Sequence, residues 1–142
     1  MKTTIISIAI VFFFITPVYS DGFDDIRIVA EVIAAEACGE GYKGMYGVGS
    51  VISNRSKQWG KTAVQIVTAK NQFYGYSAKN KHKLFQQCKG DALRIANLVS
   101  RGKIEDITQG ALYFRQPSEP TYSWHGEPTV RIGNHIFHKE KK

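Results

Sequence analysis

The sequence has little cysteine, and it shows no internal repeat and no low-complexity segment. Its two cysteines, Cys38 and Cys88, have no histidine beside them, which argues against a zinc site. After the N-terminal region, no second apolar run approaches the roughly 20 residues that a membrane span needs. A chain of 142 residues with this character is expected to form one domain around one hydrophobic core. We expect neither a metal nor a cofactor.

The N-terminal region has the pattern of a secretory signal peptide. Met1-Lys2 precedes an apolar run over residues 5–15, and Thr16-Pro17 ends this run. Residues 18–20 are small or of types that are tolerated before the cleavage site of a signal peptide. We therefore expect a signal peptide over residues 1–20 and a single exported domain over residues 21–142. The protein would then act in the periplasm, the cell wall or the extracellular medium. An uncleaved N-terminal anchor is the alternative.

Acidic residues are in the minority. The chain has 19 Lys and Arg against 12 Asp and Glu, and its net charge is +7. A basic exported protein suits an anionic polymer, such as cell-wall glycan, lipid headgroups or nucleic acid. The charge alone does not choose among these partners.

The first helix of the exported domain carries a candidate general acid, Glu36. Apolar residues recur there at three- and four-residue steps and predict one buried face, at Ile26, Val29, Ala30, Ile33, Ala34 and Ala37. Asp24-Asp25 suits the start of this helix, and Gly39 and Gly41 suit its end. Glu36 falls on or beside the apolar face. Burial and the negative end of the helix dipole would both raise its pKa, as a general acid requires. Alternatively, Glu36 flanks the apolar face and points into water, as most carboxylates do.

The rest of the chain predicts an α+β domain that is mostly helical, with a small antiparallel sheet near the C-terminus. Helices are expected over residues 43–56, 63–69 and 83–101, and strands over 111–114 and 130–137. Gly133-Asn134 would form a tight turn or a bulge. Prolines bracket an irregular loop over 117–128. The helix over 43–56 is rich in glycine, so something must approach it closely, and the first helix is the expected neighbour.

Several polar and aromatic residues are candidates for a binding groove. Asn71-Gln72 precedes aromatic residues in a loop-like stretch, and amides with aromatic rings are suited to holding sugars, although Phe73 alone could equally be core packing. Trp124 lies in the proline-bracketed loop, with Tyr122 and His125. Arg55 ends the second helix, where it could pair with a buried carboxylate or remain outside the core.

The two cysteines have two interpretations. In an oxidising compartment Cys38 and Cys88 could form a disulfide, and a bridge closing about 50 residues would stabilise the fold by roughly 4 kcal/mol. Cys88 also fits the apolar face of its helix, so a free buried thiol is the alternative.

Five motifs in order resemble the SleB/CwlJ type of cell wall hydrolases, the spore-cortex-lytic enzymes and their relatives. The motifs are residues 34–40, then Gly44 with Gly47-Val48 and 51–55, then Gln72-Phe73, then 106–114, and finally Trp124 with 132–137. Together they span about residues 28–138. Cys38 is a departure, because it stands inside the motif of Glu36 where we would expect a varied residue.

This resemblance implies a lysozyme-like fold and cleavage of peptidoglycan between N-acetylmuramic acid and N-acetylglucosamine. It implies a lytic transglycosylase in which Glu36 acts first as acid and then as base. Glu40 and Arg55 would organise the site, and the expected substrate-binding residues are Gln72, Phe73, Tyr113, Trp124 and His135. The alternatives are a muramidase that uses water and a catalytically idle peptidoglycan-binding module.

The same resemblance sets the expected partners. The protein would act as a monomer on peptidoglycan glycan strands, with no nucleic acid and no stable membrane insertion once the signal peptide is removed. A third class, an exported protein that binds nucleic acid or anionic membrane by charge alone, would leave the aromatic residues and the carboxylate motif unexplained. We also expect no appended binding domain, so that binding comes from the groove and charge of the catalytic domain itself.

Overall fold

A computed structural model describes residues 22–142 of the chain. The predicted signal peptide over residues 1–20 lies outside this described part. In order, the elements are α1 (Phe23–Ala37), η1 (Cys38–Glu40), α2 (Gly41–Trp59), α3 (Ala63–Thr68), α4 (Tyr74–Ser77), α5 (Lys81–Ser100), β1 (Tyr113–Arg115), β2 (His125–Ile132) and β3 (His135–Glu140). The prediction of a mostly helical α+β domain with a small antiparallel sheet near the C-terminus is confirmed.

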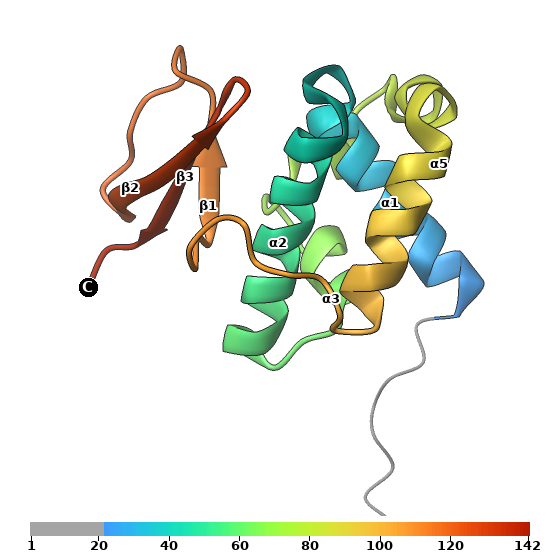
Figure 1. Ribbon diagram of the computed structural model, residues 1–142, viewed down its shortest axis with the longest axis horizontal. Helices are drawn as coiled ribbons and strands as arrows, with labels where there is room; N and C mark the ends of the chain where they lie inside the picture. Colours follow the sequence, from blue (N-terminus) through green and yellow to red (C-terminus); the bar gives the residue numbers. More distant parts are fainter. Residues whose placement is uncertain (1–21) are drawn as a thin grey trace, which may run out of the picture.

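The helices form the main core of the domain. Helices α1, α2 and α5 lie against one another (Figure 1), and the apolar face predicted for α1 is buried, including Val29, Ile33 and Ala37. Ile95 and Val99 of α5 belong to the same cluster. Thr62 begins α3 with a capping box, since its Oγ1 accepts from the N–H of Gln65 and the Gln65 side chain accepts from the N–H of Thr62.

The sheet lies on the side of α2 that faces away from α1 and α5 (Figure 1). Its strand order is β1-β3-β2, and both pairings are antiparallel. Val51 of α2 packs with Ile132 and Phe137 of the sheet in a second, smaller core. Helix α2 therefore has one face in each core, and it joins the helices to the sheet.

Gly133 with φ 56° makes a tight turn between β2 and β3, as predicted at Gly133-Asn134. Two other predictions for the last third of the chain need correction. Pro128 lies inside β2 and not in a loop, at a position where the register of the β2–β3 pair shifts. Such irregular positions tolerate proline because a regular ladder bond is already lost there. The first strand begins at Tyr113 and not at Ala111.

The expected neighbour of the glycines in α2 was also wrong. A Cβ on Gly47 would lie 2.7 Å from Cζ of Phe137, in β3, and a Cβ on Gly49 would lie 2.6 Å from Cγ2 of Ile95, in α5. The close approach therefore comes from the sheet on one side and from α5 on the other. A larger side chain at Gly47 would push the sheet away from α2, and one at Gly49 would push α5 away from α2.

Cys38 and Cys88 form a disulfide with their Cα atoms 5.9 Å apart. Cys38 opens the short helix η1, directly after α1, and Cys88 lies within α5 where the backbone departs from helical geometry. The bridge therefore ties the end of α1, which carries Glu36, to the middle of α5.

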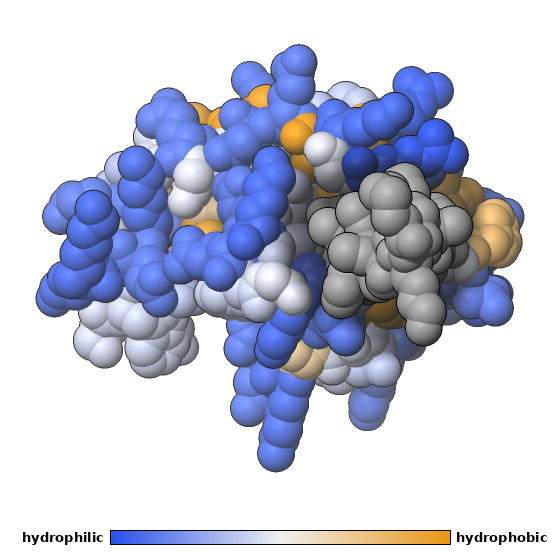
Figure 2. All heavy atoms as spheres, turned by 90° about the horizontal axis from the view of Figure 1, so that it is seen from below, coloured by the Kyte–Doolittle hydropathy of each residue, from blue (hydrophilic) through white to orange (hydrophobic). Residues whose placement is uncertain are grey.

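The surface of the described region is mainly polar. On the face shown in Figure 2, hydrophilic residues cover most of the area and apolar patches are small. Within residues 22–142, no helix combines the length and the apolar character that crossing a membrane requires.

Candidate active site

Glu36 lies in the last turn of α1, where its side chain is half-buried. Its Oε1 accepts a hydrogen bond of 2.5 Å from the backbone N–H of Gly75, in α4. A Cβ on Gly75 would lie 2.9 Å from Cβ of Ala35 and 3.0 Å from Oε1 of Glu36, so only glycine lets α4 come this close. The stretch around residues 71–76, which the sequence predicts as a loop, thus contains a helical turn that supports Glu36.

The surroundings of Glu36 favour its protonated form. Burial raises the pKa of this carboxyl above its ordinary value, and the negative charge of Glu119 adds to the effect. The hydrogen bond from Gly75 and the positive charge of Arg55 oppose it without cancelling it. A carboxyl with a raised pKa can hold its proton near neutral pH, which is the property that a general acid needs.

Arg55 is a buried cation, with 4 % of its surface exposed. Its Nε donates to the carbonyl of Leu112 at 2.7 Å, and Nη1 lies 3.4 Å from Oε1 of Gln72. Its guanidinium also lies over the ring of Phe73, 4.8 Å from the ring centre, and over Tyr113 at 5.4 Å. Burial lowers its pKa to about 10, so it stays charged at neutral pH.

The contacts of Arg55 match neither of the two interpretations that the sequence left open. The side chain is buried, and among residues 22–142 it forms no ion pair with a carboxylate. Its hydrogen bonds instead connect α2 to the segment before β1 and to the stretch before α4, which form two walls of the site.

A cleft of about 620 Å³ opens above Glu36. Of the residues predicted for the site, six line this cleft: Glu36, Arg55, Gln72, Phe73, Tyr113 and Trp124. The other lining residues are Trp59, Asn71, Tyr74, Phe114, Arg115, Glu119, Tyr122 and His125. Phe73 is itself almost fully buried and packs in the core, as its alternative interpretation predicts, and it also lines the cleft.

Two residues predicted for the site do not line the cleft. His135 is buried, and its ring packs against Phe114 with 5.0 Å between the ring centres. Glu40 lies at the β2–β3 turn, where its Oε2 accepts from the N–H of Asn134 at 2.8 Å. Within the described residues Glu40 and Arg55 form no hydrogen bond with each other, since Arg55 bonds to Leu112 and Gln72. Glu40 connects η1 to the sheet below the cleft.

One wall of the cleft carries a pair of stacked aromatic side chains, Tyr122 and Trp124. The rings of Tyr122 and Trp124 lie 4.6 Å apart between centres and within 3° of parallel. About half of each side chain is exposed, 48 % for Tyr122 and 50 % for Trp124. An exposed flat aromatic surface beside a half-buried acid is suited to holding a sugar ring by stacking.

The sequence pattern pointed to Trp124 but missed Glu119, which lies in the same proline-bracketed loop. Glu119 gives no periodic or motif signal, because its position in the cleft depends on how residues 116–124 fold. Its Oε2 accepts from the N–H of Gln116 at 2.7 Å, and Nη1 of Arg115 donates to the carbonyl of Glu119 at 3.2 Å. These local bonds fix the loop with the carboxylate toward the cleft.

No group of three or more His, Cys, Asp or Glu side chains within residues 22–142 is placed to hold a metal ion.

Comparison with known proteins relates this arrangement to cell wall enzymes. The sequence model of the cell wall hydrolase family matches residues 39–138, more than two thirds of the chain. The match starts at Gly39, three residues after Glu36, and includes Glu40, Arg55 and the sheet as far as His138. The cell wall hydrolase CwlJ of Halalkalibacterium halodurans is 28% identical over 108 residues, which cover 72% of this chain and 76% of that protein.

Two solved structures share the fold. The catalytic domain of Bacillus cereus SleB superposes with a TM-score of 0.67 at 25% identity, covering 85% of this chain and 95% of that one. The catalytic domain of the germination-specific lytic transglycosylase SleB from Bacillus anthracis gives a TM-score of 0.65 at 26% identity, covering 88% of this chain and 100% of that one.

Proposed function

The chain belongs to the cell wall hydrolase family, and we propose that it is a lytic transglycosylase that cuts peptidoglycan between N-acetylmuramic acid and N-acetylglucosamine. The observation that carries this proposal is a half-buried acid in an open cleft, Glu36, whose pKa is raised by burial. The relative from Bacillus anthracis, whose name gives the same activity, adds support. Peptidoglycan lies outside the cytoplasmic membrane, which fits the export predicted from residues 1–20.

In the proposed reaction, Glu36 first acts as a general acid. Its proton passes to the glycosidic oxygen while the bond from C1 of the muramoyl residue to this oxygen breaks. The Glu36 carboxylate then accepts the proton of the 6-hydroxyl of the same muramoyl residue, and the oxygen of this hydroxyl bonds to C1. The product ends in a 1,6-anhydro ring, no water is consumed, and Glu36 is protonated again.

One carboxylate is enough for this route because the nucleophile belongs to the substrate. A glycosidase that uses water needs a second carboxylate across the scissile bond. Glu40, the other carboxylate of the Glu36 motif, accepts a hydrogen bond at the β2–β3 turn and does not line the cleft. Glu119 does line it and is therefore the residue on which the alternative, a muramidase, would depend.

The test of the proposed function is the release of soluble fragments from purified peptidoglycan. We expect soluble muropeptides to appear at physiological salt as well as at low salt. In the proposed complex the cleft would hold the glycan by hydrogen bonds and ring stacking, which depend little on salt. Attachment by charge alone would decline steeply over this salt range. Binding without release would show an idle module, and salt-sensitive binding without release would show a charge-binding protein. Either outcome would contradict the proposal.

A further inference from the structure

The stacked pair Tyr122–Trp124 is held in place by a histidine. The backbone N–H of Tyr122 donates to Nδ1 of His125 at 3.2 Å, which closes the end of the loop onto the first residue of β2. The rings of Tyr122 and Trp124 both meet the His125 ring edge-on, with centres 5.6 Å and 6.0 Å away. His125 also lines the cleft. One imidazole therefore supports both aromatic rings of this wall.

The hydrogen bond from Tyr122 needs a lone pair on Nδ1 of His125. In a neutral imidazole this fixes the tautomer with the proton on Nε2, whereas in the imidazolium both nitrogens are donors and neither can accept. Protonation of His125 therefore removes the acceptor of the Tyr122 N–H and leaves the backbone bond from the N–H of His125 to the carbonyl of Tyr122, at 3.0 Å. It also places the N–H of Tyr122 against the new Nδ1–H of His125, and two donors cannot form a hydrogen bond with each other.

Aromatic and charged side chains from β1, from β3 and from the loop before β2 surround His125. From β3, the ring of His138 stacks on it with centres 4.9 Å apart and planes within 16°. From β1, Tyr113 packs at 5.6 Å between ring centres, and Arg115 contributes a positive charge. From the loop, Glu119 contributes a negative charge.

Burial lowers the pKa of His125, the charges of His138 and Arg115 lower it further, and Glu119 opposes them in part. Glu140 is its partner across the β2–β3 pair, but the carboxylate of Glu140 accepts instead from the amide of Gln58, at 3.0 Å. Within residues 22–142 no carboxylate forms an ion pair with His125. The neutral ring thus fits this position better than the charged one.

We propose that neutral His125 is a positioning residue that holds the Tyr122–Trp124 pair in the arrangement that binds the glycan, and that protonation of His125 releases this pair. The idea rests on the proposed function, because it assigns the stacked rings to glycan binding. Acidification from about pH 8 to about pH 5, the range in which histidines titrate, then weakens glycan binding without any change at the reacting atoms.

The test measures binding of soluble glycan strands, prepared from peptidoglycan, to the Glu36→Gln protein. This background removes both cleavage and the titration of Glu36. We expect the dissociation constant to rise about two- to tenfold from pH 8 to pH 5, the range for the loss of one ordinary hydrogen bond.

Two substitutions separate positioning from a merely structural role. His125→Asn keeps an acceptor oxygen near the position of Nδ1 but does not titrate, so binding is expected to stay tight and to become independent of pH. His125→Leu removes the acceptor, so binding is expected to be weak at every pH. His82→Asn, at an exposed histidine of α5, is the matched control and is expected to keep the pH dependence.

An unchanged pH dependence in His125→Asn would overturn the proposal, as would tight binding at pH 8 in His125→Leu. If the protein binds no glycan at all, the proposed function fails, and the positioning role is tested separately. The indole N–H signal of Trp124 in NMR, assigned with a Trp59→Phe variant, is expected to titrate together with the His125 ring. An indole signal that stays fixed while the His125 ring titrates would overturn the positioning role on its own.

Discussion

Replacement of Glu36 by glutamine is expected to lower peptidoglycan cleavage by at least ~100-fold, the low end for the loss of a general acid. Glutamine has nearly the same size and can still accept the hydrogen bond from Gly75. It cannot donate a proton to the glycosidic oxygen. The fold and the binding of glycan are therefore expected to persist, as judged by thermal unfolding and by cosedimentation with peptidoglycan.

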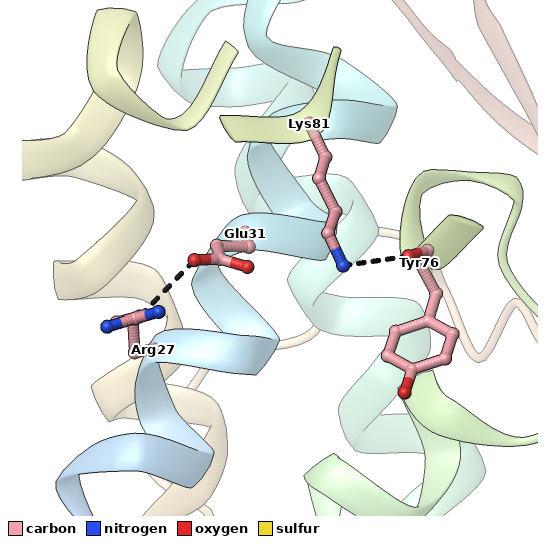
Figure 3. Close-up of polar contacts among 4 residues, drawn as sticks. All are labelled: Arg27, Glu31, Tyr76 and Lys81. Atoms are coloured by element: carbon pink, nitrogen blue, oxygen red, sulfur yellow. Dashed lines mark hydrogen bonds and ion pairs between the residues drawn. The ribbon is translucent and has the colours of Figure 1, made fainter. Parts of the chain in front are cut away.

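Glu31→Gln is the matched control for this measurement. Glu31 lies on the same helix, and its Oε1 accepts from Nε of Arg27 at 3.2 Å; Figure 3 shows this pair and the contact between Lys81 and Tyr76. Because Glu31 does not line the cleft, this variant should cleave at the parental rate. Full activity in Glu36→Gln would remove the basis of the proposed mechanism.

Removal of the disulfide is expected to cost roughly 4 kcal/mol of unfolding free energy, since the bridge joins residues 50 positions apart. This is a large share of the 5–15 kcal/mol that typically stabilises a domain. Urea unfolding of a Cys38→Ser/Cys88→Ser variant should show the loss directly. We expect the largest local loss of stability at the end of α1, because the bridge holds that end against α5.

Reductant supplies the control. The parental protein should lose stability when it is reduced, and the double variant should be unaffected. Two thiols that titrate in the folded, unreduced protein would contradict the bridge, and they would support the alternative of a buried free thiol at Cys88.

The helices could be predicted well because their signal is local. The apolar spacing in α1 fixed both the buried face and the place of Glu36 beside it, and the capping residues fixed the start of α3. The glycines of α2 also gave a correct local signal, a close approach. Which element approaches was not predictable, because Phe137 and Ile95 reach α2 only through the tertiary arrangement of the sheet and α5.

The site was predicted in part for the same reason. Residues that belong to motifs, such as Arg55 and Trp124, could be selected from the sequence, and the structure brings both to the cleft. His135 also belongs to a motif, but the strand turns it into the core. The positions of Glu119 and His125 in the cleft depend on how one irregular loop folds, and no periodic pattern in the sequence predicts this.

The identity of the cleavage products tests the central proposal most directly. Purified peptidoglycan is digested with the protein, and the soluble muropeptides are identified by mass spectrometry. If Glu36 acts as the only acid and base, the products end in 1,6-anhydromuramic acid and are lighter by one water than hydrolysed fragments. Products with reducing ends alone would show that water is the nucleophile, which would contradict the transglycosylase mechanism and point to Glu119 as the second carboxylate in the cleft.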